Sequence, residues 1–84
     1  MKHVDTIETD GWNISVNEIF TNGRMPYRLK VTKIEIENEQ ANPNDAKIYC
    51  VAVDLKNEKK LFHTVDVPEG DSNRAWYINE FWSK

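Results

Sequence analysis

Two runs of alternating apolar and polar residues constrain this chain more than any other feature. They cover positions 12–20 and 27–31, and the connection between them contains Asn22, Gly23 and Pro26. Alternation at every second position is the pattern of a β-strand with one buried face, and Asn, Gly and Pro are typical of turns. We therefore predict an antiparallel hairpin. Its inward side chains would be Trp12, Ile14, Val16, Phe20, Tyr27, Leu29 and Val31, with Glu18 as the polar exception.

The alternation slips by one residue after Val31, because the next large aliphatic side chains are Ile34 and Ile36. An unbroken strand would turn the charged Lys33 toward the core. One extra residue near Thr32, a β-bulge, would restore the pattern. The predicted register with this bulge pairs Phe20 with Tyr27, Val16 with Val31, Ile14 with Ile34 and Trp12 with Ile36.

A second hairpin is predicted for residues 47–67, after a polar loop over Asn38 to Ala46 that contains Pro43. A turn centred on Glu58 aligns the apolar positions of its two strands, and Pro68 ends the return strand. The aligned pairs are Leu55 with Leu61, Val53 with His63, Val51 with Val65 and Tyr49 with Val67, and we expect all of them on the core side.

Residues 72–83 are predicted to form a helix, because they contain no Gly or Pro and follow residues that favour helix N-termini. The candidate caps are Asp71, Ser72 and Asn73. At about 100° per residue, the predicted buried stripe is Tyr77, Ile78, Phe81 and Trp82, with Ala75 at its margin. Trp76 falls on the opposite side, between Asn79 and Glu80. An extended strand is the alternative for this aromatic segment.

These elements predict one α+β domain over residues 1–84, because a chain of this length closes a single small core. Four antiparallel strands in two hairpins occupy 12–67, and the C-terminal helix over 72–83 packs on one face of the sheet. The sequence pattern of residues 1–10 predicts their secondary structure less clearly. Within them, Val4 to Thr9 could add a short edge strand.

The residues that enzymes and metal sites require are sparse in this chain. Its three glycines lie too far apart for a phosphate-binding loop or a Gly-x-Ser-x-Gly turn. Cys50 and His63 fall on opposite faces of the predicted sheet, so they would not form a nucleophile and base pair. His3, Cys50 and His63 have no spacing typical of a zinc site. We expect no catalytic activity, no cofactor and no metal.

The composition predicts a cytoplasmic protein that does not enter a membrane. Cys50 is the only cysteine, so no disulfide can form within the chain, and residues 1–10 lack the apolar run of a signal peptide. No run of 18 apolar residues occurs. The net charge is −3, but it is segregated. Residues 24–33 carry bases without acids, and residues 34–46 carry acids without bases.

Trp76 carries the functional prediction, because a large ring on the polar side of a helix forgoes burial in a small domain. Either another part of the chain covers it, the N-terminal segment or the loop at Pro68, or it binds a partner. Trp is common among residues that dominate protein–protein binding energy. We expect Trp76, Asn79 and Glu80 to bind another protein, and the domain to act as a regulator or inhibitor, of the kind mobile elements encode. The acidic residues Glu35, Glu37, Glu39 and Asp45 could imitate a phosphate backbone in such an inhibitor.

The alternative partner is single-stranded nucleic acid, bound on the outer face of the sheet. Arg28, Lys30 and Lys33 would meet phosphates there, and Phe62 or Ile19 would meet bases. The net charge of −3 opposes this alternative, because it weakens the electrostatic attraction to a polyanion. The sequence also leaves open a homodimer, which would form if the strand over 27–37 were an exposed edge and paired with a second copy.

Overall fold

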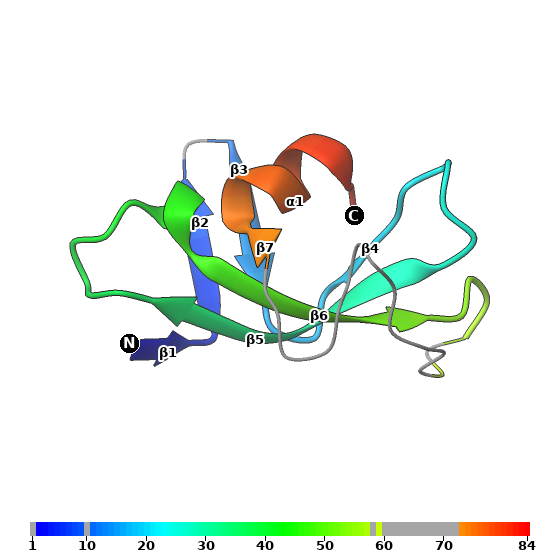
Figure 1. Ribbon diagram of the computed structural model, residues 1–84, viewed down its shortest axis with the longest axis horizontal. Coiled ribbons are helices and arrows are strands. Elements are labelled where there is room, and N and C mark those ends of the chain that lie inside the picture. The colour runs from blue at the N-terminus through cyan, green and yellow to red at the C-terminus, as the bar shows by residue number, and fades with distance from the viewer. Residues whose placement is uncertain (1, 10, 58, 60–72) are drawn as a thin grey trace.

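The computed structural model describes residues 2–9, 11–57, 59 and 73–84, and within them it is a small α+β fold with a single C-terminal helix (Figure 1). The predicted fold class is therefore confirmed. The elements are β1 (Lys2–Val4), β2 (Thr6–Thr9), β3 (Trp12–Ser15), β4 (Ile19–Phe20), β5 (Arg28–Ile36), the 3-10 helix η1 (Pro43–Asp45), β6 (Lys47–Val53), β7 (Asn73–Arg74) and α1 (Ala75–Phe81).

β5 is the central strand of the main sheet, whose order is β1-β5-β6-β7 with β4 also paired to β5. One edge of β5 pairs with β6, and the other pairs with β4 near its start and with β1 near its end. Both edges of β5 are already used within the chain. The strand over 27–37 is thus not an exposed edge, so it does not offer the free edge suggested for pairing two copies, and a homodimer through another edge stays a prediction.

The predicted bulge in β5 is confirmed. The register between β5 and β6 shifts between Val31 and Lys33, which leaves Thr32 as the extra residue. Thr32 is exposed, and its hydroxyl donates a hydrogen bond to the carbonyl oxygen of Tyr49 at 3.1 Å. The bulge keeps both Val31 and Ile34 fully buried, as the slip in alternation required.

The predicted register of the first hairpin is wrong, because the N-terminal segment takes the place expected for residues 12–16. Val4 lies opposite Ile34, where Ile14 was expected. β3 pairs instead with β2, in a separate two-stranded sheet that places Ile7 opposite Ile14. The short β4 remains on β5, with Phe20 opposite Leu29 rather than Tyr27.

Asn17 explains why residues 12–20 do not form one continuous strand. Its φ of 75° lies in the left-handed region, which Asn tolerates better than most residues. Its backbone N–H donates to the carbonyl oxygen of Val31 at 2.8 Å, while the N–H of Val16 donates to Asp5 at 2.9 Å. At this residue the chain therefore stops pairing with β2, as β3, and begins to pair with β5, as β4.

The buried face of β6 is the opposite of the predicted one. Ile48, Cys50 and Ala52 are buried, whereas Tyr49 and Val51 are only half-buried. The buried three lie opposite Ile34, Val31 and Leu29 of β5, and residues opposite each other in a ladder share a face. Of the predicted inward set, Val53 is buried and Leu55 is 53% exposed. The predicted return strand over 61–67 lies outside the described residues.

The C-terminal helix is confirmed but shorter than predicted, because residues 73 and 74 pair with β6 as β7 before it begins. Ala75, Ile78 and Trp82 are buried, as expected, and Tyr77 is half-buried. Phe81 was predicted to be buried and is 50% exposed. Of the expected caps, Asp71 and Ser72 lie outside the described residues. The N-cap is Arg74, which makes no side-chain capping hydrogen bond.

One hydrophobic core joins the two sheets and the helix. It contains Ile7 and Ile14 from the β2–β3 pair, the inward residues of β5 and β6, and Ala75, Ile78 and Trp82. In Figure 1, α1 and the β2–β3 pair lie on the same side of the long β5–β6 ladder. Among the described residues, no helix is long and apolar enough to cross a membrane.

We expect that Val31 and Val51, whose side chains are chemically identical, differ in their effect on stability. Val31→Ala removes methyl groups from a side chain with no exposed surface, so it should lower the free energy of unfolding by about 2–3 kcal/mol. Val51→Ala alters a half-buried side chain on the other face and should cost less than half of that. Urea titrations followed by tryptophan fluorescence measure both, and a larger loss for Val51 would contradict the assignment of faces.

Candidate functional site

The exposed side of α1 carries three aromatic residues in contact, Trp76, Tyr77 and Phe81, which we call the aromatic face. Trp76 is 46% exposed and Phe81 is 50% exposed. The rings of Trp76 and Tyr77 meet edge to face with centroids 6.1 Å apart, and those of Tyr77 and Phe81 lie 4.8 Å apart. The face is thus a continuous aromatic surface rather than isolated rings.

Trp76 is 46% exposed, as predicted, so the described N-terminal segment does not enclose its ring. The loop at Pro68, the other cover that the sequence suggested, lies outside the described residues. Phe81 was missed as a surface residue, because the stripe predicted for a longer helix placed it inside. The helix ends at Phe81, and Trp82 is extended at φ −127° and ψ 152°. Trp82 is buried, and its ring centroid lies 6.0 Å from that of Tyr27.

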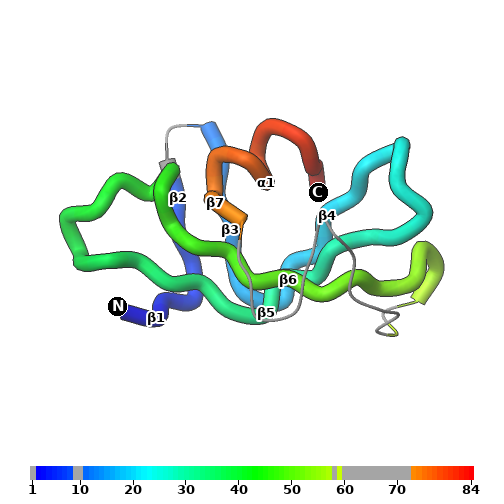
Figure 2. Tube along the Cα trace, viewed as in Figure 1, coloured from blue at the N-terminus to red at the C-terminus, as the bar shows by residue number. Residues whose placement is uncertain are grey.

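The helix is held at both ends, which fixes the direction of the aromatic face. At its start, the N–H of Ala75 donates to the carbonyl oxygen of Ala46 at 2.9 Å. After its end, Thr21 and Ser83 exchange two backbone hydrogen bonds of 2.6 and 2.9 Å. Figure 2 shows this C-terminal end beside the chain near β4. Because Ile78 is fully buried between these two anchors, α1 has little freedom to turn its rings inward.

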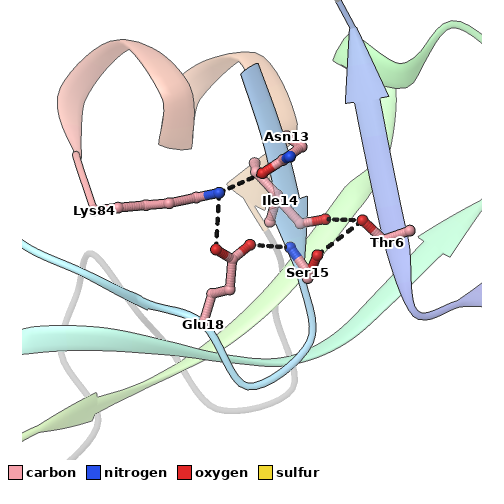
Figure 3. A network of polar contacts seen from close by, with 6 residues as sticks. All are labelled: Thr6, Asn13, Ile14, Ser15, Glu18 and Lys84. Atoms are coloured by element: carbon pink, nitrogen blue, oxygen red, sulfur yellow. Dashed lines mark hydrogen bonds and ion pairs between the residues drawn. The ribbon is translucent and has the colours of Figure 1, made fainter.

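A polar network connects Lys84, the residue after Ser83, to the β2–β3 pair (Figure 3). The ammonium of Lys84 lies 2.8 Å from a carboxylate oxygen of Glu18 and also donates to the side chain of Asn13. The other oxygen of Glu18 accepts a hydrogen bond from the N–H of Ser15, whose hydroxyl lies 2.8 Å from that of Thr6. These polar groups satisfy one another, so the network is structural.

Asn79 and Glu80, the other two residues predicted to bind a partner, are both exposed on α1. Within the described residues, Glu80 makes no ion pair. Asn79 borders a shallow hollow of about 470 Å³, lined also by Trp12, Trp82 and Lys84. The structure therefore places all three predicted residues on one exposed helix and adds Phe81 to them.

The basic residues predicted to meet nucleic acid are engaged within the protein. The guanidinium of Arg28 donates to the carbonyl oxygen of Asp54 at 3.0 and 2.9 Å and to that of Asn57 at 3.0 Å. The ammonium of Lys33 lies 4.2 Å from the centre of the Tyr49 ring. Lys30 is half-buried, and Phe62 lies outside the described residues.

Two acids of the predicted phosphate-mimicking run hold the N-terminal segment in place. His3 and Glu35 are joined through nitrogen and oxygen atoms 2.9 Å apart, and Lys2 forms an ion pair with Glu39. A hydrogen bond from Tyr49 and the contact with His3 lower the pKa of the Glu35 carboxyl. The hydrogen bond from Lys2 likewise lowers the pKa of Glu39.

The other two acids of that run, Glu37 and Asp45, line a polar hollow of about 600 Å³ beside the start of α1. Lys47 and Arg74 line the same hollow, and Arg74 donates to the carbonyl oxygen of Asp45 at 2.7 Å. The hollow therefore presents both charges at once. It offers no uniformly acidic surface of the kind that would imitate a nucleic acid.

Cys50 is the one thiol of the chain, and burial raises its pKa to about 12. A thiol in this state is a poor nucleophile, because the reactive form is the thiolate. His63 lies outside the described residues. Within the described residues, His, Cys, Asp and Glu side chains form no group of three that could hold a metal ion.

No protein-family model, curated protein or solved structure matches this chain. The geometry of its own residues is therefore the basis for assigning a function. Among the described residues, two of the three exposed large hydrophobic side chains, Trp76 and Phe81, belong to the aromatic face.

We expect native Cys50 to react very slowly with iodoacetamide. At pH 8 a thiol with a pKa of about 12 is ionised roughly a thousandfold less than an ordinary cysteine. Alkylation of the folded protein, followed by mass spectrometry, should be slower than that of the urea-unfolded chain by about this factor. Equal rates in the two states would show that Cys50 is accessible.

The pairing of Glu35 predicts a dependence of stability on pH. Because folding lowers the pKa of Glu35, its contribution is complete above the ordinary value of 4.5 and is lost as pH falls through the lowered value. Glu35→Gln should lower the melting temperature at pH 7 and flatten its decline below about pH 4.5. Glu37→Gln, at an exposed acid two residues away, is the control and should change neither. An unchanged acid decline in Glu35→Gln would contradict this role.

Proposed function

We propose that this domain is a small regulator or inhibitor that works by binding another protein through the aromatic face of α1. The observation that carries the proposal is the exposure of Trp76 and Phe81, at 46% and 50%, on a helix anchored at both ends. A binding role of this kind needs no catalytic group. It requires a rigid surface with apolar area to bury.

The energetics support a protein partner. Trp and Phe each bury on the order of 150–250 Å² when fully enclosed, and apolar burial is worth roughly 25 cal/mol per Å². The rings of this face are already in contact with one another through Tyr77, so little conformational entropy remains to be lost on binding. Such aromatic residues on a rigid element are typical of the residues that dominate binding energy at interfaces.

Single-stranded nucleic acid has less support as the partner. Arg28 is held by backbone carbonyl oxygens and Lys33 by an aromatic ring, and Glu35 lies on the same strand. The net charge of −3 gives little release of counterions from a polyanion. Nothing on the described outer face corresponds to the exposed aromatic surface of α1.

Replacing aromatic residues of α1 should abolish capture of the partner while the fold stays intact. We expect tagged Trp76→Ser and Phe81→Ser each to lose the protein captured by the wild-type domain from native lysate. Because about half of each side chain is already buried, each variant should also lose about 1–3 kcal/mol of stability, so capture is compared at a temperature at which circular dichroism shows both variants to be folded. Capture by the wild type should resist nuclease and high salt.

Leu55→Ser is the matched control, because Leu55 is 53% exposed and lies after β6, outside α1. This variant should capture the partner normally. If Leu55→Ser lost the partner as well, capture would depend on exposed apolar side chains in general, and the aromatic face would not be the specific site. Capture that disappears with nuclease but ignores Trp76 would favour the nucleic-acid alternative.

A further inference from the structure

Resting on the proposed function, we infer that the partner presents an arginine or lysine, flanked by an apolar side chain, to Trp76 and Glu80. The cation would lie on the ring of Trp76 and against the carboxylate of Glu80. The apolar side chain would cover Phe81. The inference names the chemistry of the partner, which the proposed function leaves open.

The spacing of Trp76 and Glu80 brings an aromatic ring and an acid to one side of the helix. Residues four apart in a helix are neighbours on its surface, and both of these are exposed. Trp is the aromatic residue that attracts a cation most strongly, and arginine is the cation most often found over it. A carboxylate beside the ring adds a charge-assisted hydrogen bond to the same cation.

Glu80 is exposed to water in the free protein. It is the only formally charged residue of α1, and within the described residues it makes no ion pair. It also lies in the last turn of the helix, where the negative end of the helix dipole disfavours an acid. A cation from a partner would relieve both effects, so complementary charge gives binding energy at this position.

The two described cations that flank α1 in the sequence, Arg74 and Lys84, have other partners. Arg74 donates to the carbonyl oxygen of Asp45 at the start of the helix, and Lys84 is held by Glu18 and Asn13. Neither pairs with Glu80. An acidic partner or a nucleic acid would bring its charge against the Glu80 carboxylate and be repelled.

Selection from a library of random short peptides displayed on phage tests this inference. The wild-type domain is the target, and Trp76→Ser, with its melting temperature checked, is used to remove peptides that bind elsewhere. We expect the remaining peptides to be enriched in arginine or lysine next to a large apolar residue. Their affinity, measured by fluorescence anisotropy, should fall roughly tenfold for Glu80→Lys and less for Glu80→Gln, as for a partly exposed charge pair.

Asp5→Lys is the control for charge, because Asp5 is an exposed acid between β1 and β2, and it should leave affinity nearly unchanged. Peptides that need Trp76 and Phe81 but are neutral or acidic, or that ignore Glu80→Lys, would overturn the inference and leave the proposed function standing. Failure to enrich any peptide that depends on Trp76 would count against both. Self-association that Trp76→Ser abolishes would identify a second copy as the occupant and overturn the basic partner.

Discussion

The pairing of β5 with β6 is the interaction on which the rest of the structure depends. It places Ile34 opposite Ile48 and Leu29 opposite Ala52, all four fully or almost fully buried. The other edge of β5 then receives β1 and β4, and β6 receives β7. Because β7 leads directly into α1, the position of the helix over the core follows from this one ladder.

The same ladder accounts for the aromatic face. Ala75, Ile78 and Trp82 point from the C-terminal segment into the core. Trp76 and Phe81 are not part of that buried side of the short helix, and no further layer covers them among the described residues. A helix of seven residues makes about two turns, so a large share of its side chains faces solvent. The exposure of Trp76 and Phe81 is therefore a consequence of where α1 is anchored.

The sequence predicted what one segment determines by itself and failed where segments compete. The bulge at Thr32 was readable because the slip between Val31 and Ile34 concerns a single strand. The buried face of β6 was not, since Ile48 to Val53 is apolar at nearly every position and either alternating set could face the core. The pairing of β1 with β5 was missed because Val4 and Ile14 offer similar aliphatic side chains to Ile34. The left-handed turn at Asn17 interrupts the strand that would have placed Ile14 there.

The same distinction explains the candidate site. Trp76 was identified because it lies opposite the predicted buried stripe, whereas Phe81 lies at the margin of the side that Ala75 and Ile78 bury. When Trp82 leaves the helix in an extended conformation, it supplies the bulk that a longer helix would have drawn from Phe81. Several other acids hold distant parts of the chain together. Glu18 pairs with Lys84, Glu35 with His3 and Glu39 with Lys2. Glu80, on the same helix as the exposed rings, has no such contact in the described structure, and in the proposed interaction its carboxylate meets a cation of the partner.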